Sequence, residues 1–164
     1  MKKNFERLVK IIAILVLGVF AISCGKGGKG SAEPGSIEAI KKAGKIRIGV
    51  FGDKPPFGFV DENGKNQGYD IYLAKRLAKD LLGDENKIEF ITLEAANRVE
   101  YLLSNKVDII LANFTVTDER KQKVDFAKPY MKVSLGIVSP EGAPIKDVKE
   151  LKGKKLIVNK GTTA

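Results

Sequence analysis

The side chains in this 164-residue sequence that could take part in chemistry are mainly cations, because 29 Lys and Arg residues stand against 20 acidic residues. There is one Cys and no His. That combination excludes Cys–His nucleophilic pairs, zinc fingers and disulfide frameworks, and it removes the commonest acid–base catalyst. No nucleophile–base pair or metal-spaced carboxylate cluster is present either, so we expect no enzyme activity, no cofactor and no metal site.

The net charge of +9 raises the question of a nucleic-acid partner. The charges are spread along the chain, however, and no block of five or more residues carries one sign. The most Lys-rich stretch, residues 146–160, is interrupted by Asp147 and Glu150. The positive balance is therefore interpreted as a solvated surface, with no nucleic-acid partner.

The first residues have the pattern of a secretory signal peptide, with a basic start followed by an uncharged run over 11–22. This run is too short to span a bilayer, which takes about 20 residues. Residues 21–30, AISCGKGGKG, resemble a bacterial lipobox, so we expect residues 1–23 to be cleaved and Cys24 to be lipidated. An ordinary signal anchor with an incidental Cys is the alternative. Residues 24–37 are rich in Gly and Ser and predict a flexible tether.

Beyond the tether, periodic hydrophobic residues predict alternating strands and helices. Ser36 can cap a short helix that ends at Gly44, and an amphipathic helix is expected over 70–82, with Asp70 as its cap. A loop or hairpin precedes that helix. The other expected helices cover 97–105, 117–124 and a turn at 148–151, and the expected strands cover 45–50, 87–93, 107–112, 133–138 and 154–158. This order favours an α/β fold with a largely parallel sheet covered on both faces.

Three segments, residues 46–78, 108–130 and 151–163, together resemble solute-binding protein family 3, the extracytoplasmic receptors of polar-amino-acid ABC transporters. The run EAANRVEYL looks most like the cysteine-binding branch of that family. The resemblance implies the two-lobe, hinge-linked type II periplasmic binding protein fold. Residues 38–132 would form a nearly complete lobe 1, and residues 133–164 would form the hinge crossing and the start of a truncated lobe 2.

The resemblance also implies residues that bind a ligand carboxylate. Arg120 lies where the family's carboxylate-binding Arg is found, and a guanidinium offers a rigid fork of paired donors. A surface pair with Asp118 or Glu119 is the alternative for Arg120. The matching strand end is Asn113, Phe114 and Thr115, and the matching element of lobe 2 is Thr162 and Thr163. A capping or turn role is the alternative for Thr115, and N-capping of a following helix is the alternative for Thr162 and Thr163.

Three further residues are assigned by resemblance to the ligand pocket. Arg98 matches an Arg that contacts ligand in several relatives, although a salt bridge to Glu94 or Glu100 is the alternative. Lys54 replaces an aromatic residue common in relatives, which argues against a large cationic ligand. Phe57 is expected to wall the pocket or to belong to the core. The ammonium partner is expected beyond Ala164.

The function implied by the resemblance is an exported, monomeric receptor on a bacterial membrane, periplasmic or at the cell surface and lipid-anchored through Cys24. It would deliver a small polar L-amino acid to an ABC transporter permease, with cysteine as the first expectation and glutamine or an acidic amino acid next. The alternatives are an enzyme like cyclohexadienyl dehydratase on the same fold, and a sensory or adhesive surface lipoprotein.

Overall fold

A computed structural model of the chain describes residues 32–164. The expected signal peptide, Cys24 and the first part of the tether lie outside the described residues. The chain divides into two units, 1–31 and 32–164, and only the second is discussed below. Within this second unit, no helix has the length and apolar character needed to cross a membrane.

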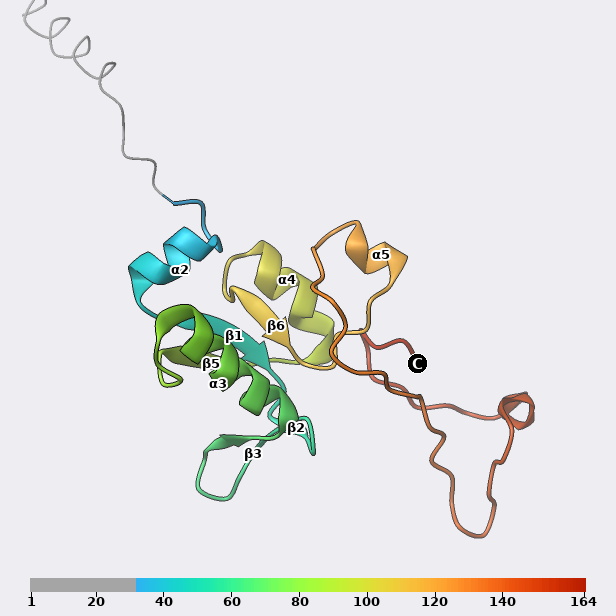
Figure 1. Ribbon diagram of the computed structural model, residues 1–164. Coiled ribbons are helices and arrows are strands. Elements are labelled where there is room, and N and C mark those ends of the chain that lie inside the picture. The colour runs from blue at the N-terminus through green and yellow to red at the C-terminus, as the bar shows by residue number, and fades with distance from the viewer. Residues whose placement is uncertain (1–31) are drawn as a thin grey trace, which may run out of the picture. The chain divides into compact units, whose positions relative to one another are not determined.

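A three-stranded parallel sheet forms the centre of the fold, as the sequence predicts (Figure 1). Its strands are β1 (Ile46–Val50), β5 (Ile88–Thr92) and β6 (Ile109–Leu111), in the order β5-β1-β6. Ile48 of β1 is in register with Phe90 on one side and Ile109 on the other. Among the described residues β6 pairs only with β1, so its outer edge is open.

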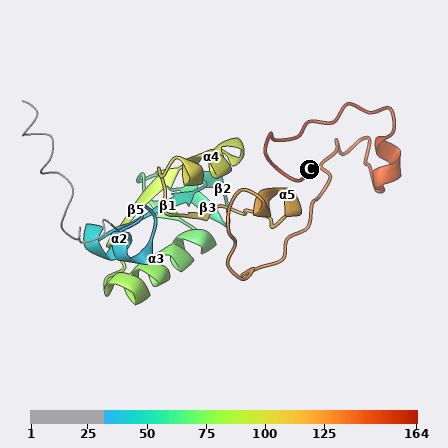
Figure 2. The same ribbon diagram turned by 90° about the horizontal axis from the view of Figure 1, so that it is seen from above.

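Helices cover both faces of this sheet, and Figure 2 shows α3 (Tyr69–Leu82) and α4 (Arg98–Leu103) on opposite sides of it. Alternate residues of β1 point to the same face, which brings Ile46, Ile48 and Val50 against α3. Ile71, Ala74 and Ala78 are the buried apolar residues of α3, matching the expected amphipathic face. Helix α2 (Ile37–Ala43) adds Ile40 to this core, and the Ser36 hydroxyl caps the helix as expected.

A small three-stranded antiparallel sheet leads into α3 and sets where that helix begins. Its strands are β2 (Asp53–Lys54), β3 (Gly58–Val60) and β4 (Asn66–Gln67). The helix cap is Gly68, whose φ of 114° and close approach to the Phe57 carbonyl leave no room for a side chain. The expectation that Asp70 caps α3 is therefore wrong, because Asp70 lies inside the first turn.

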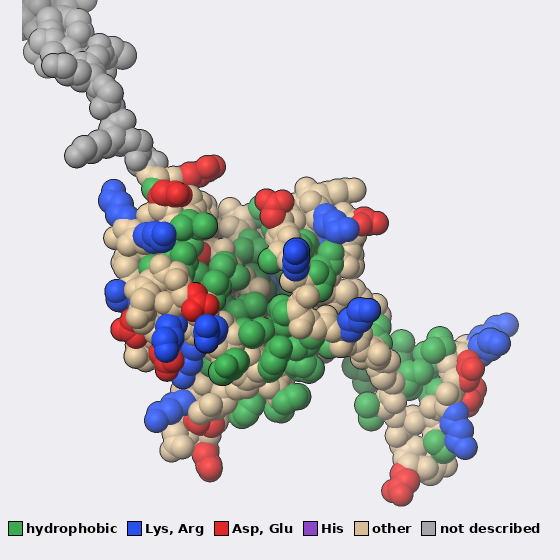
Figure 3. Space-filling model, viewed as in Figure 1, with side chains coloured by type: hydrophobic (Ala, Val, Ile, Leu, Met, Phe, Trp, Pro, Cys, Tyr) green, Lys and Arg blue, Asp and Glu red, His purple; other side chains and the backbone are tan. Residues whose placement is uncertain are grey.

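The remaining elements are short. They are η1 (Ala95–Asn97), which precedes α4, then α5 (Asp118–Lys121), and η2 (Val148–Leu151) at the expected helical turn. The strands expected over 133–138 and 154–158 are wrong, since neither segment pairs with another strand among the described residues. Alternating apolar residues make a strand only where a neighbour accepts and donates the backbone hydrogen bonds. Several apolar side chains there lie at the surface, with Val138 99% and Ile157 96% exposed (Figure 3).

Candidate functional site

The carboxyl ends of the three parallel strands meet at one edge of the sheet, and the predicted site residues follow them. Lys54 comes after β1, Arg98 comes after β5, and residues 113–115 come after β6. In α/β folds this edge is where ligands bind, because loops from several strands converge there. The strand order therefore brings together residues that are far apart in the sequence.

Arg98 is buried at this edge, with only 3% of its surface exposed, and four backbone carbonyls hold its guanidinium. Its Nε donates to the Ala95 carbonyl at 3.0 Å, and its Nη1 donates to those of Ala112 at 2.8 Å and Asn113 at 3.1 Å. Its Nη2 donates to the Gly161 carbonyl at 2.7 Å. Burial, and then the charge of Arg120, lowers the pKa of Arg98 to about 10, which leaves it charged at neutral pH. Among the described residues Arg98 forms no ion pair with Glu94 or Glu100, so the alternative of a salt bridge is not observed.

Arg120 extends from α5, whose first turn is capped by the Thr117 hydroxyl. Its Nη1 donates to the Thr115 carbonyl and its Nη2 to the Gly161 carbonyl, both at 2.7 Å. The neighbouring carboxylates of α5 pair instead with Lys121 and Lys123. The surface pairing considered for Arg120 is therefore not formed.

The two arginines converge on one atom, because both Nη2 groups donate to the same Gly161 oxygen. Their guanidinium carbons lie over the Phe114 ring, 4.6 Å from its centroid for Arg98 and 4.7 Å for Arg120. Arg98 also lies 5.6 Å from the Phe51 ring centroid. Aromatic faces attract cations, so these rings help to hold two like charges close together.

Gly161 reaches the arginines because it is a glycine. Its φ is +81°, and a side chain there would lie 2.6 Å from the Ala96 Cα. The Thr162 hydroxyl donates to the Asn159 carbonyl at 2.8 Å, which closes the turn. No hydrogen bond of the Thr163 side chain is formed among the residues that the structure describes, so its assigned contact with ligand stays a prediction.

A cavity of about 330 Å³ adjoins this turn, lined by Phe51, Lys54, residues 94–97, Asn159 and Lys160. The Lys54 amine lies 5.6 Å from the Phe51 ring centroid and pairs with Asp53. Phe57 does not line this cavity; its backbone carbonyl accepts from the Asp70 amide at 2.8 Å. Sequence reasoning did not find Phe51, although its position directly after a predicted strand was a usable signal.

A larger cavity, of about 630 Å³, is lined by residues of β6 and by residues 125–133. Asn113, Phe114 and Thr115 line one end of it. Arg98 and Arg120 line neither of the two cavities.

Residues 46–164 match the sequence profile described as bacterial extracellular solute-binding proteins, family 3. The chain belongs to this family. Its fold class is accordingly the type II periplasmic binding protein fold, as the resemblance implied.

Three relatives in the family bear on the ligand. The chain is 37% identical over its whole length to a glutamine-binding ABC transporter protein of Bacillus subtilis, covering 62% of that protein. It is 32% identical to an L-cystine-binding protein of Escherichia coli, covering 90% of this chain and 56% of the relative. A crystal structure of a cysteine-binding protein from Campylobacter jejuni superimposes with a TM-score of 0.76 and 65% identity, covering 78% of this chain and 52% of that one. The chain therefore spans less than two thirds of each relative.

Proposed function

We propose that this chain is part of an extracytoplasmic receptor of an ABC importer, and that the arginine pair binds the α-carboxylate of an amino acid. The observation that carries the proposal is the convergence of the Arg98 and Arg120 Nη2 groups on a single oxygen, 2.7 Å from each. Two guanidinium groups that donate to one acceptor form a suitable binding site for a carboxylate, because hydrogen bonds between charged partners are stronger than those between neutral ones. The Gly161 carbonyl marks the position where we expect a carboxylate oxygen.

The two guanidiniums have different parts in this proposal. Each has five N–H donors. Four of those of Arg98 are used by backbone carbonyls, so it contributes mainly its charge and a fixed position. Arg120 uses two, which leaves three for a ligand among the residues that the structure describes. Arg120 is therefore the principal carboxylate-binding residue.

The neighbouring cavity is proposed to take the ligand side chain. Its volume of about 330 Å³ is enough for the side chain of a small polar amino acid, and Ala95 and Ala96 keep part of its wall free of bulky groups. Its wall carries two cations, Lys54 and Lys160, against one carboxylate, Glu94, and this balance opposes a cationic side chain. We therefore propose L-cysteine as the first candidate, with glutamine or an acidic amino acid next. Support comes from the 65% identity to the cysteine-binding protein over 78% of this chain, whereas the 37% identity to the glutamine-binding protein is taken over the whole chain.

Capture is proposed to occur in two steps, with residues 38–132 as lobe 1 and residues 133–164 as the hinge crossing and the beginning of lobe 2. Arg120 and the strand end at 113–115 bind the ligand first. The Gly161 carbonyl then gives up its position on the arginines to the ligand carboxylate, and lobe 2 closes so that Thr162 and Thr163 of the 161–163 turn reach that carboxylate. The closed monomer would dock on a membrane permease, and a lipid on Cys24 would hold the receptor at the membrane.

A thermal-shift screen of the twenty amino acids on the full-length protein tests this function. L-cysteine is expected to raise the Tm saturably, since ligand at 100 times its Kd stabilises a folded protein by about 2.7 kcal/mol. No stabilisation by any amino acid would overturn the proposal. Turnover of prephenate or arogenate would overturn it in favour of the enzyme alternative.

A further inference from the structure

The loop that carries Arg120 is closed at its two ends by an aromatic pair. Phe114 follows β6 and Phe126 follows the turn after α5, and their ring centroids lie 5.1 Å apart at an interplanar angle of 46°. Tilted rings at such a separation attract one another beyond the apolar area that they bury. Residues 114–126 therefore form a loop whose ends are held together by two of its own side chains.

The path of the backbone through this loop explains how the two rings meet. The amides of Lys123 and Val124 both donate to the Arg120 carbonyl, at 2.9 and 3.0 Å, so the chain turns back directly after α5. The Arg120 side chain reaches the other end of the loop, because its Nη1 donates to the Thr115 carbonyl at 2.7 Å. The position of this guanidinium therefore depends on how the loop is closed.

Phe114 is also the ring over which both guanidiniums lie, with the Arg98 and Arg120 carbons 4.6 and 4.7 Å from its centroid. Two neighbouring cations repel each other, which opposes this arrangement. The electron-rich face of the ring offsets part of the repulsion, but only while the ring keeps its orientation toward both groups. Phe126 packs on this ring from the segment after α5, and the contact limits its rotation.

Neither phenylalanine belongs to the cavity proposed for the ligand side chain. Phe114 and Phe126 both line the larger cavity of about 630 Å³. The smaller cavity is lined by other residues, and none of them comes from the 114–126 loop. An effect of Phe126 on ligand binding must therefore pass through Phe114 and the arginines rather than through contact with the ligand.

We propose that Phe126 is a positioning residue for the carboxylate site: its ring packs on Phe114, closes the 114–126 loop and fixes the aromatic face over which the two arginines lie. The inference rests on the proposed function, because its effect on binding is exerted through Arg98 and Arg120. Phe114, in this arrangement, acts on the arginines and not on the ligand side chain.

Calorimetric titration of L-cysteine into full-length protein tests this role with two variants of Phe126. Phe126→Leu keeps an apolar side chain but removes the ring. We expect it to bind about five- to ten-fold more weakly than the wild type, because one aromatic pair is lost and the face over which two cations lie is held less firmly. Phe126→Tyr keeps the ring, and the adjoining cavity has room for its hydroxyl, so it should bind within about two-fold of wild type.

Phe90→Leu is the matched control for a merely structural effect. Phe90 belongs to β5 and packs against the hydrophobic core around β1. Its loss should lower the Tm but leave the affinity for L-cysteine within about two-fold of wild type. Phe126→Leu binding within two-fold of wild type would overturn the proposal, as would equal losses of affinity in Phe126→Leu and Phe126→Tyr, or in Phe126→Leu and Phe90→Leu. If Phe126→Leu fails to fold, Phe126→Met takes its place with the same outcomes.

The Arg98 side chain gives a spectroscopic readout that needs no ligand. Its Nε–H is held by the Ala95 carbonyl at 3.0 Å, and its guanidinium lies over the Phe114 ring, whose ring current shifts nearby protons. In ¹H–¹⁵N spectra this resonance should move in Phe114→Leu and, by a smaller amount, in Phe126→Leu. A resonance unchanged in Phe126→Leu would overturn the proposal. If the wild type binds no amino acid, the proposed function fails, whereas this resonance still reports whether Phe126 holds the Phe114 ring in place.

Discussion

Replacing Arg120 by Ala is the sharpest test of the carboxylate site, because this guanidinium is the one with donors to spare. In the structure it gives two hydrogen bonds to backbone carbonyls, those of Thr115 and Gly161. The substitution removes these and every donor that remains for a ligand. The fold should survive, since Arg120 is half-buried and belongs to the four-residue helix α5 rather than to the core around β1.

The magnitude follows from the number of hydrogen bonds lost. Two charge-assisted bonds to a carboxylate, at about 1.5–3 kcal/mol each, correspond to about 3–6 kcal/mol of binding free energy. That predicts a loss of affinity of roughly 10²- to 10⁴-fold. The two bonds to protein carbonyls contribute about 1 kcal/mol each to stability, so the free energy of unfolding should fall by no more than about 2 kcal/mol.

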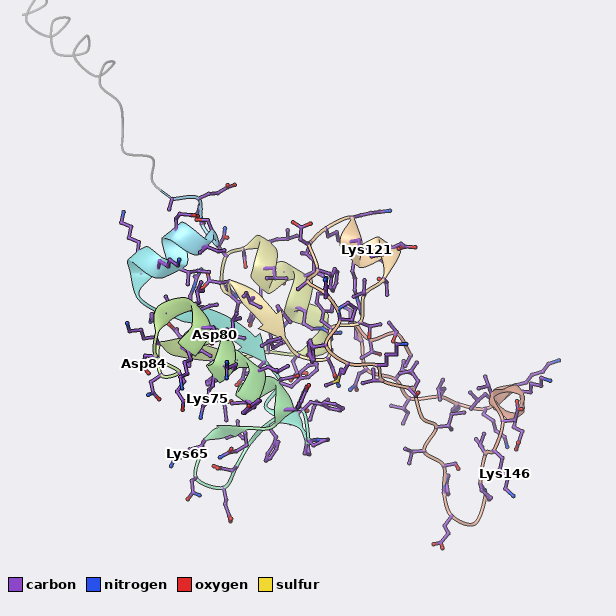
Figure 4. All side chains as sticks on the ribbon, in the orientation of Figure 1. Lys65, Lys75, Asp80, Asp84, Lys121 and Lys146 are labelled. Atoms are coloured by element: carbon purple, nitrogen blue, oxygen red, sulfur yellow. The ribbon has the colours of Figure 1, made fainter. Side chains whose placement is uncertain are left out.

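Calorimetric titration with L-cysteine measures the first quantity, and denaturant unfolding measures the second. Lys121→Ala is the matched control, because Lys121 is the next residue of α5, is labelled in Figure 4, and pairs only with the exposed Asp118. It should leave affinity unchanged. An Arg120→Ala protein that binds L-cysteine within ten-fold of wild type would refute the assignment of Arg120.

Three further predictions concern other parts of the chain. Gly161→Ala should weaken L-cysteine binding in calorimetry by about ten-fold, because a φ of +81° strains any side chain and the 161–163 turn would then close less readily on the ligand; unchanged affinity would show that this turn does not close on the ligand. Burial raises the pKa of the Asp70 carboxyl, so the contribution of Asp70 to the free energy of unfolding is fully present below the ordinary pKa of an aspartate and is lost as the pH rises through the raised pKa. The Tm of the wild type relative to that of Asp70→Asn should therefore increase as the pH falls, and a Tm difference that does not change with pH would contradict this. Cys24→Ser should move the protein from the membrane fraction to the soluble fraction and abolish incorporation of a labelled fatty acid, whereas retention of label would contradict the lipidation site.

The central fold was predictable because its elements carry their own signals. Alternating apolar residues predicted β1, and the 3.6-residue period of buried residues predicted α3 to within one residue of its observed start. The strands expected over 133–138 and 154–158 carry the same kind of alternation. Their failure has a physical reason, since a strand depends on partners and the sequence pattern does not say whether partners are in reach.

The sequence predicted which residues belong to the candidate site, but not how they contact one another. Arg98 and Arg120 could be named from their motifs, but nothing in the sequence indicates that both donate to the carbonyl of Gly161, which is 41 residues from Arg120. Asp70 was expected to cap a helix because Asp often does so. The actual start of α3 depends on the packing of Gly68 against Phe57, a tertiary contact that local propensity cannot anticipate.

The open edge of β6 has a practical consequence for handling residues 32–164 as a separate polypeptide. An edge strand with free backbone amides and carbonyls is a template for pairing with another chain, and here it borders an apolar cavity of about 630 Å³. Two copies that meet along this edge could extend the sheet from three strands to six. We therefore expect this fragment to self-associate with increasing concentration, and a lysine substituted for a residue on the exposed edge of β6 to keep it monomeric.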